Sequence, residues 1–436
     1  MTNNISSDIK KPTYSAVLIG HVDAGKSTIG GSILNSLNLI DSRTLDKYKK
    51  ESAEMYRESW YLSWALDTNP EERAKGKTVE ICKVGISLEN TNVSLIDSPG
   101  HKLYVSQMIA GANQADIAIL VISAKQNEFE AGLKGGQTRE HIILAKAGNI
   151  DKVVVVINKM DEINYNEEIY RSMISKLDMI LAKLFSKIKY IPVSGLNSIN
   201  INKREKDDPM EWYKEETLLE YLNGIKIERS NKLLATIVEK NKNIYTIRIE
   251  SGRINIKSDT NNTTNVKILP SNSSNVITNI YDEEDIEIEE AEGGEEVKIK
   301  MKNDEEYILG SIITNDNFLE EKMSNLSINK TDKLSVGNKF TANLNILEAK
   351  NLITAGYQCI LHVRMYSTEC KIIELRKEVE EGGKKKMVRI KYAKKKDRVL
   401  VKIETKDNIV LNTNDKFAIR DEDMTVAIGQ VRHILE

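Results

Sequence analysis

Residues 20–27 read GHVDAGKS and fit the pattern G-x-x-x-x-G-K-[ST] of a phosphate-binding loop. The two glycines allow a tight turn, so that consecutive N–H groups and a following helix can point at a polyphosphate. The flanking residues agree, because 14–19 (YSAVLI) is typical of a buried strand and 27–37 (STIGGSILNSL) of a helix. Lys26 is expected to reach the β- and γ-phosphates and Ser27 to bind Mg²⁺. The sequence therefore predicts a nucleotide-binding protein.

A second motif, DSPG at residues 97–100, follows the alternating apolar run 92–96 (NVSLI). This pattern places Asp97 at the end of a predicted strand and Gly100 in a loop. In a GTPase, Asp97 would hold Mg²⁺ through water, and the N–H of Gly100 would contact the γ-phosphate and register its loss. The motif therefore narrows the prediction from nucleotide binding to a GTP switch.

Two single residues near these motifs are candidates for the reaction itself. Thr78 lies in the stretch 75–80 (KGKTVE), between the phosphate loop and Asp97, where a second Mg²⁺ ligand is expected. His101 follows Gly100 directly, and of the five histidines it is the one placed to reach an attacking water. The residues leave open whether His101 acts as a base or as an electrostatic orienter.

The base specificity is predicted by two motifs further along the chain. Residues 158–161 (NKMD) end the Val-rich run 152–157 (KVVVVI), at the carboxyl ends of parallel strands, where ligands gather. Asp161 can accept two hydrogen bonds from the edge of guanine, which adenine cannot donate. Residues 194–196 (SGL) follow another strand-like run, 189–193 (KYIPV), and are expected to close over the base. Together they favour GTP over ATP.

These motifs resemble the translational GTPases related to elongation factor Tu and elongation factor 1-alpha. The strings GHVDAGKST, DSPGHKLYV, GGQTREHIILAKAGNI, NKMD and SGLN carry the resemblance over most of residues 14–200. Within that superfamily, residues 60–80 (WYLSWALDTNPEERAKGKTVE), Ala24, and 128–130 with 135–136 are most similar to the eukaryotic class II peptide-chain release factor. Trp60, Tyr61 and Trp64 could also be core residues, because their spacing is helical.

The resemblance implies GTP/GDP and Mg²⁺ as cofactors and assigns a role to each matching residue. Val22 matches one wing of an apolar gate in front of the catalytic histidine, and Asp23 matches a carboxylate of the phosphate loop that supports catalysis. The candidate residues are Gly20, His21, Asp23, Ala24, Gly25, Lys26, Ser27, Thr28, Asn158, Lys159, Asp161, Ser194, Gly195 and Leu196 for the nucleotide, Ser27, Thr78 and Asp97 for Mg²⁺, and Val22, Asp23, Gly100 and His101 for catalysis.

Length and composition agree with a multidomain protein of the cytoplasm. The chain has 436 residues, more than one hydrophobic core normally supports. Its formal net charge of −2 gives no global basicity to hold it on RNA, so any ribosome contact must be local. Cys82, Cys359 and Cys370 lack metal-ligand spacing and indicate a reduced compartment. No run of about 18 apolar residues favours a membrane span.

The pattern of the chain changes near residue 225, after a predicted helical segment at 212–222 (WYKEETLLEYL). Short β-type runs separated by polar turns follow, as is typical of barrels. We therefore predict an α/β P-loop GTPase domain, with a mostly parallel sheet and helices on both faces, followed by two all-β barrel domains. The predicted boundaries are 1–225, 226–328 and 329–436.

Two features of the predicted third domain bear on partners. Residues 384–398 (KKKMVRIKYAKKKDR) predict a hairpin with a basic exterior, which could touch ribosomal RNA phosphates or an acidic partner. Ala355 stands where the release factors usually have proline, and Asp423 where glycine is common. Both changes lie in the domain expected to bind the partner.

The resemblance implies a monomeric GTPase that delivers a class I release factor to a ribosome at a stop codon. No affinity for aminoacyl-tRNA is expected of this branch. Two other interpretations remain: an elongation-factor-like carrier of aminoacyl-tRNA or ribosome-rescue GTPase, and a GTP-sensing binding module without turnover. The presence of all the expected catalytic residues argues against the last.

Overall fold

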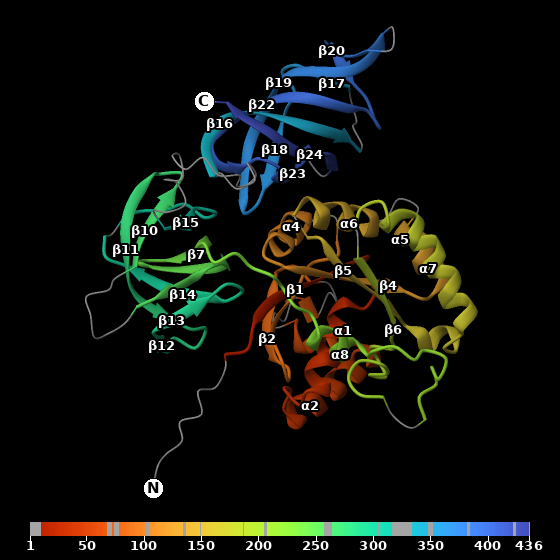
Figure 1. Cartoon of the computed structure of the whole chain (residues 1–436). Coiled ribbons are helices and arrows are strands. Elements are labelled where there is room, and N and C mark those ends of the chain that lie inside the picture. Colours follow the sequence, from red (N-terminus) through yellow and green to blue (C-terminus); the bar gives the residue numbers. More distant parts are fainter. Residues whose placement is uncertain are drawn as a thin grey trace. The chain divides into compact units, whose positions relative to one another are not determined.

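The computed structural model describes most of the chain, and its contacts divide the chain into two compact units. The first unit comprises residues 1–111, 115–139 and 152–227, and the second comprises 112–114, 140–151 and 228–436 (Figure 1). The described residues are 10–67, 72–73, 78–101, 104–133, 137–148, 150–185, 187–204, 207–256, 264–303, 305–315, 334–347, 352–381, 384–421 and 424–435. Residues 75–77, 135–136 and Asp423, and the predicted boundary at residue 328, lie outside them.

A six-stranded sheet forms the centre of the first unit, in the order β2-β3-β1-β4-β5-β6. β2 runs antiparallel to β3, and the other neighbouring pairs are parallel. All seven residues of β4 are buried, as expected for a strand that helices cover on both faces. The predicted mostly parallel sheet is confirmed. The strands are β1 (Thr13–Gly20), β2 (Cys82–Ser87), β3 (Asn92–Asp97), β4 (Ile117–Ser123), β5 (Lys152–Asn158) and β6 (Lys187–Pro192).

Helices connect these strands and flank the sheet (Figure 1). α1 (Lys26–Ser36) follows β1 directly, and η2 (Ser63–Ala65) packs on it. This approach requires a glycine, because a Cβ on Gly31 would lie 1.9 Å from the carbonyl oxygen of Leu62. The remaining helices are α2 (Ser42–Glu54), η1 (Glu58–Trp60), α4 (Val105–Asn113), α5 (Gln126–Leu133), α6 (Gln137–Ala147), η4 (Met160–Ile163), α7 (Glu167–Leu181) and α8 (Leu218–Asn223).

The predicted helix at 212–222 is wrong over its first half. α8 begins at Leu218, where Thr217 and Glu220 form a capping box. The aromatic residues before it pack on α7 instead of continuing a helix. The ring of Trp212 lies 5.1 Å from that of Tyr170, and its Nε1 donates to the carbonyl oxygen of Tyr165 at 2.9 Å. Tertiary packing of aromatic side chains thus overrides the helical pattern.

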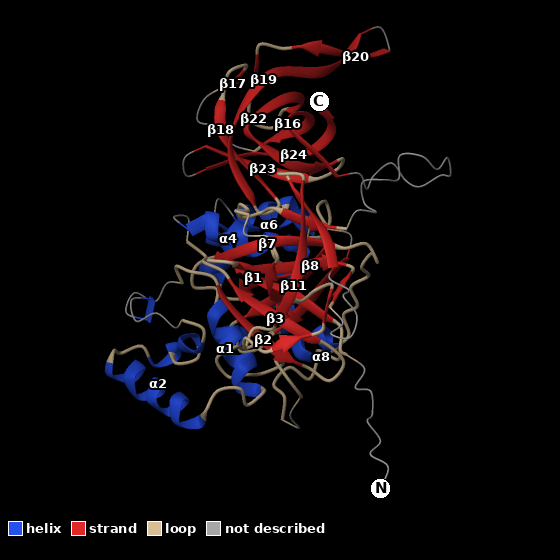
Figure 2. Cartoon of the chain, turned by 90° about the vertical axis from the view of Figure 1, so that its left-hand side faces the viewer, coloured by secondary structure: helices blue, strands red, loops and turns tan. Residues whose placement is uncertain are grey.

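Residues from 234 onward form two closed antiparallel barrels, which confirms the predicted all-β class (Figure 2). The first barrel closes through β10 and β11, and the second through β18 and β19. The strands of the first are β7 (Leu234–Asn241), β8 (Ile244–Ser251), β10 (Thr264–Leu269), β11 (Ser273–Tyr281), β14 (Glu296–Met301) and β15 (Ile312–Thr314), with β9 (Arg253–Asn255), β12 (Glu287–Ile288) and β13 (Glu290–Glu292) beside them.

The second barrel is built from longer strands, and its core includes Leu269 and Ile312 of the first barrel. Its strands are β16 (Leu334–Ile346), β18 (Gln358–Val363), β19 (Tyr366–Glu381), β22 (Arg398–Asn412), β23 (Lys416–Asp421) and β24 (Met424–Leu435), with β17 (Ile353–Thr354), β20 (Lys384–Arg389) and β21 (Tyr392–Ala393) beside them. Within the described part of the chain, no helix has the length and apolarity needed to cross a membrane.

A half-buried histidine of the second barrel gives the stability of the chain a pH dependence. Burial, together with the nearby charge of Arg420, lowers the pKa of His362 to about 4. In the unfolded chain this histidine has a pKa of about 6.5. As the pH falls from about 6.5 towards 4, the unfolded chain binds the proton first, which lowers the free energy of unfolding by up to about 3 kcal/mol. We expect His362→Gln to flatten the fall of the thermal midpoint over that range. His433→Gln removes an exposed histidine and is the control, which should leave the fall unchanged. A thermal midpoint of His362→Gln that falls as steeply as that of the unchanged protein would contradict this expectation.

Candidate nucleotide-binding site

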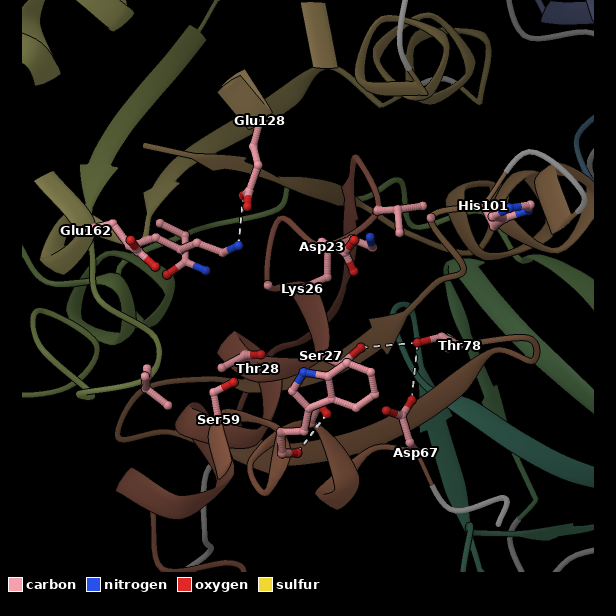
Figure 3. A pocket seen from close by; sticks show the side chains of 18 of the residues that line it. Asp23, Lys26, Ser27, Thr28, Ser59, Asp67, Thr78, His101, Glu128 and Glu162 are labelled. Atoms are coloured by element: carbon pink, nitrogen blue, oxygen red, sulfur yellow. Dashed lines mark hydrogen bonds and ion pairs between the residues drawn. The ribbon is translucent and has the colours of Figure 1, made fainter. Parts of the chain in front are cut away.

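A pocket of about 450 Å³ in the first unit brings most of the predicted site residues together (Figure 3). They come from five segments far apart in the sequence: the phosphate loop with the start of α1, the segment before β2, and the loops after β3, β5 and β6. The predicted residues in its lining are Val22, Asp23, Gly25, Lys26, Ser27, Thr28, Thr78, Gly100, His101, Asn158, Lys159, Asp161 and Leu196.

The phosphate loop connects β1 to α1 through two residues in left-handed backbone conformations. Asp23 has a φ of 61° and Gly25 a φ of 91°. Gly25 is also needed for space, because a Cβ there would lie 2.3 Å from Nδ2 of Asn158. α1 begins at the next residue, so its first N–H groups open onto the pocket. The local sequence therefore builds an anion-binding helix N-terminus.

Lys26 lies across its own loop. Its Nζ donates to the carbonyl oxygens of Gly20, at 3.2 Å, and His21, at 3.0 Å. The side chain is only 7% exposed, and this burial lowers its pKa in spite of the nearby carboxylates of Asp97 and Asp23. The loop thus holds a poorly hydrated ammonium group beside its backbone donors, which is an arrangement suited to phosphate oxygens.

The donor set predicted for Mg²⁺ fits a hard cation. Ser27 Oγ lies 3.2 Å from Thr78 Oγ1, which in turn donates to Oδ1 of Asp67 at 3.2 Å. Both carboxylate oxygens of Asp97 are buried, with no hydrogen bond of good geometry among the described residues. Burial raises the pKa of Asp97 to about 6, against the lowering effects of the nearby Ser27 hydroxyl and of the Lys26 charge. Hydroxyl and carboxylate oxygens are the ligands that Mg²⁺ prefers. The predicted set has only one carboxylate among its ligands and so differs from a cluster of three or more His, Cys, Asp or Glu side chains, of which the described part of the chain has none placed to hold a metal.

Asn158, at the end of β5, forms hydrogen bonds to both the phosphate loop and the loop after β6. Its Nδ2 donates to the carbonyl oxygen of Ala24 at 2.9 Å, and its Oδ1 accepts from the N–H of Gly195 at 2.9 Å. Ser194 Oγ donates to Oδ1 of Asp161 at 2.5 Å, which fixes that carboxylate at the edge of the pocket. The geometry therefore places a fixed acceptor where the predicted guanine edge would lie.

Several predicted residues stand just outside the pocket lining and support it. Asp97 acts on Lys26 through its charge, and Ser194 holds Asp161. His21 lines a smaller neighbouring cavity, and burial lowers its pKa, with a further contribution from Lys26. The predicted residues outside the lining of the main pocket are Gly20, His21, Ala24, Asp97, Ser194 and Gly195.

The structure adds pocket residues to which the sequence analysis gave no site role. Trp60 lines the pocket, and the guanidinium of Arg57 lies 4.2 Å from the centre of its ring. Trp64, in contrast, is only 1% exposed and belongs to the hydrophobic core. Burial raises the pKa of Asp67 to about 7, helped by the charge of Asp97. The added residues are Ser59, Trp60, Ser63, Asp67, Glu128 and Glu162.

Two of these residues form ion pairs between residues 125–128, at the start of α5, and the loop after β5. Glu128 Oε2 accepts from Lys159 Nζ at 2.8 Å, and Glu162 Oε2 lies 3.7 Å from Lys125 Nζ. Figure 3 shows Glu128 and Glu162 at the end of the pocket away from His101. No sequence signal pairs them, because the partners are about thirty residues apart. The Glu128–Lys159 pair ties a residue of the NKMD motif to α5.

His101 lines the other end of the pocket, beside the phosphate loop (Figure 3). Its ring lies 6.1 Å from that of Tyr104, at an angle of 52°. Val22, the predicted gate residue, lines the same pocket, and its N–H donates to Oε1 of Gln137 at 3.5 Å. The pocket thus contains both residues, and their roles in catalysis stay predictions.

Comparisons with known proteins find relatives over nearly the whole chain. Residues 11–243 match the model of the elongation factor Tu GTP-binding domain, and residues 333–435 that of the elongation factor Tu C-terminal domain. The GTPase-like domain of Saccharomyces cerevisiae Ski7, whose structure was solved with bound GTP, is 18% identical, with 97% of each chain covered and a TM-score of 0.72. At that identity the likeness shows a shared fold.

Two curated relatives are called eukaryotic peptide chain release factor GTP-binding subunit. The one from Schizosaccharomyces pombe is 36% identical, over 100% of this chain and 67% of the relative. The one from Kluyveromyces lactis is also 36% identical, over 98% of this chain and 61% of the relative. The chain therefore spans about two thirds of the length of these proteins. At this identity and coverage, the chain belongs to the family of eukaryotic peptide chain release factor GTP-binding subunits.

Proposed function

We propose that this protein is a translational GTPase that binds and hydrolyses GTP on the ribosome and supports stop-codon termination with a class I release factor. The observation that carries the proposal is the single pocket in which the phosphate loop, Thr78, Gly100 with His101, and Asp161 meet. The names of the relatives that match over 98–100% of this chain support the termination role. The same relatives support the cytoplasm as its location.

The two ends of the pocket would bind the two ends of GTP, the guanine base and the phosphates. At one end Asp161, held by Ser194, accepts hydrogen bonds from the guanine edge. At the other end Lys26 and the first N–H groups of α1 bind the phosphates. Ser27 and Thr78 would hold Mg²⁺ directly and Asp97 would hold it through water; when bound, the ion neutralises phosphate charge.

Hydrolysis needs a positioned water more than covalent chemistry from the protein. His101 orients this water once the ribosome has docked, while the N–H of Gly100 binds the γ-phosphate and Asp23 supports the loop. Val22 keeps the imidazole away from the phosphate until docking. The isolated protein should therefore hydrolyse GTP slowly, and rapid turnover without ribosomes would count against this mechanism.

A binding experiment separates the termination role from the carriage of aminoacyl-tRNA. The full chain, loaded with a non-hydrolysable GTP analogue, is titrated with a class I release factor and, in parallel, with charged tRNA. The proposal requires saturable binding to the release factor by a monomeric protein and no preference for charged tRNA over the same tRNA without its amino acid. Tight binding of charged tRNA instead would assign the chain to the carriers. Ala355, exposed after β17, is a site at which a change to proline should alter only release-factor affinity.

The Glu128–Lys159 ion pair should slow nucleotide release. Burial acts to raise the pKa of Glu128, but the hydrogen bond from Lys159 overrides it, so the pair is charged at neutral pH. Removing the charge by Glu128→Gln loosens the NKMD loop, at a cost of about 1 kcal/mol, so GDP should dissociate about fivefold faster. Stopped-flow fluorescence of a labelled GDP measures this rate. Glu162→Gln is the matched control, since its 3.7 Å pair is more exposed. Equal rates for both variants would exclude a special role for Glu128.

A further inference from the structure

The second barrel carries a two-stranded ribbon that continues into a strongly basic segment. β19 and β20 pair antiparallel, and the chain then runs through β21 into the start of β22. We call residues 386–398 the basic segment. Its exposed basic side chains are Lys386, Arg389, Lys391, Lys394, Lys395, Lys396 and Arg398.

The basic segment itself carries seven basic residues and one carboxylate. Its single carboxylate is Asp397, which already accepts from Lys377 Nζ at 2.8 Å. On β19, Arg376 stands in register with Arg389 but pairs with Glu374 at 2.9 Å, so β19 adds little net charge beside the basic segment. The glutamates at 378, 380 and 381 lie in register with residues 384–387, towards the tip of the ribbon. The sequence at the tip therefore contains both acidic and basic residues, and the excess of positive charge lies after the tip, in residues 389–398.

Protection of an exposed sheet edge accounts for only part of this charge. β20 is the edge strand of its sheet, and lysines on an edge strand discourage pairing with other chains. That explanation covers Lys386 and Arg389. It extends to Lys391 and Lys394, which flank β21, an edge of its own two-stranded sheet. It does not cover Lys395 and Lys396, which lie in the turn before β22 and call for another explanation.

We propose that the basic segment binds the phosphate backbone of double-stranded RNA. Cations spread along a ribbon and a turn suit a line of phosphates, and counterion release drives such binding. Lysine is depleted at protein–protein interfaces, so a surface with five lysines favours nucleic acid over an acidic protein. Tyr392, 54% exposed, is the one aromatic residue of the segment, so there is no platform for stacking unpaired bases.

The test uses the full chain and a blunt 20-base-pair RNA duplex, followed by fluorescence anisotropy from 50 to 200 mM KCl. Binding should weaken steeply with salt. The triple variant Lys386→Gln, Lys391→Gln, Lys396→Gln should bind at least about tenfold more weakly, and the slope of log K against log salt should fall by up to about 3. Three arginines at the same positions should preserve binding.

The matched control removes three exposed lysines from the first barrel, at Lys242, Lys300 and Lys302, with the same loss of net charge. It should bind RNA as the unchanged protein does. Equal losses in both triple variants, or no loss in the first, would overturn the proposal. Binding to poly-glutamate that is tighter than to the duplex and lost in the first variant would assign the segment to an acidic protein. Because the assay needs neither ribosome nor GTP, its failure is distinguishable from failure of the proposed GTPase role.

Discussion

His101→Ala is expected to lower ribosome-stimulated GTP hydrolysis by about 100- to 10,000-fold and to leave GTP affinity nearly unchanged. The imidazole lies at the end of the pocket by the phosphate loop, away from the end where Glu162 lies (Figure 3). It can therefore act on the attacking water without holding the ground-state nucleotide. Because an interaction made only in the transition state lowers the rate and not the affinity, the two measurements separate catalysis from binding.

Single-turnover hydrolysis on ribosomes and equilibrium binding of a labelled GTP analogue measure these two quantities. His433→Ala removes an exposed histidine of β24 and serves as the control, with both quantities unchanged. If His101→Ala hydrolysed GTP at the normal rate, the water-orienting role would be wrong. If it lost GTP affinity in parallel with the rate, His101 would instead be a binding residue.

Asp161→Asn should exchange the base specificity of the pocket. The carboxylate accepts hydrogen bonds from the two donors at the edge of guanine, whereas an amide would present an NH₂ group to them. Losing two charge-assisted bonds should lower GTP affinity by at least about 100-fold. Xanthine carries a carbonyl in place of the guanine amino group, so the variant should gain affinity for XTP. Ser194, which donates to Oδ1 at 2.5 Å, can still hold the new side chain.

Competition binding with GTP, XTP and ATP tests this exchange. Glu162→Gln, next to the motif, is the control and should keep the preference for GTP, because its side chain pairs with Lys125. A loss of affinity for all nucleotides in Asp161→Asn would indicate a structural role for the carboxylate. An unchanged preference for GTP would remove Asp161 from the base site.

The parts of the site that could be predicted are those whose function depends on a few residues close together in the sequence. The phosphate loop requires Gly25 because the backbone is left-handed there and Asn158 leaves no room for a Cβ. The NKMD motif ends a buried strand, so its position at the edge of the sheet follows from strand topology. The alternating runs after residue 234 likewise indicated barrels, and the structure confirms them.

The parts that could not be predicted depend on which segments meet in space. Asp67 enters the pocket because η2 packs on α1 at Gly31, a contact that no periodicity reveals. Glu128 meets Lys159 only because α5 and the loop after β5 lie at the same edge of the sheet. The segment before α8 was predicted as helix together with α8 itself, but Trp212 packs on Tyr170 instead. Roles that depend on docking, such as the gate at Val22, stay predictions for the same reason.

We propose that this pocket hydrolyses GTP in response to a ribosome that carries a release factor. Multiple-turnover GTP hydrolysis by the full chain is measured with purified ribosomes, with and without a class I release factor from the same source. We expect slow hydrolysis by the protein alone and stimulation that requires both partners and is lost in His101→Ala. Intact GTP binding with no stimulation by either partner would contradict it.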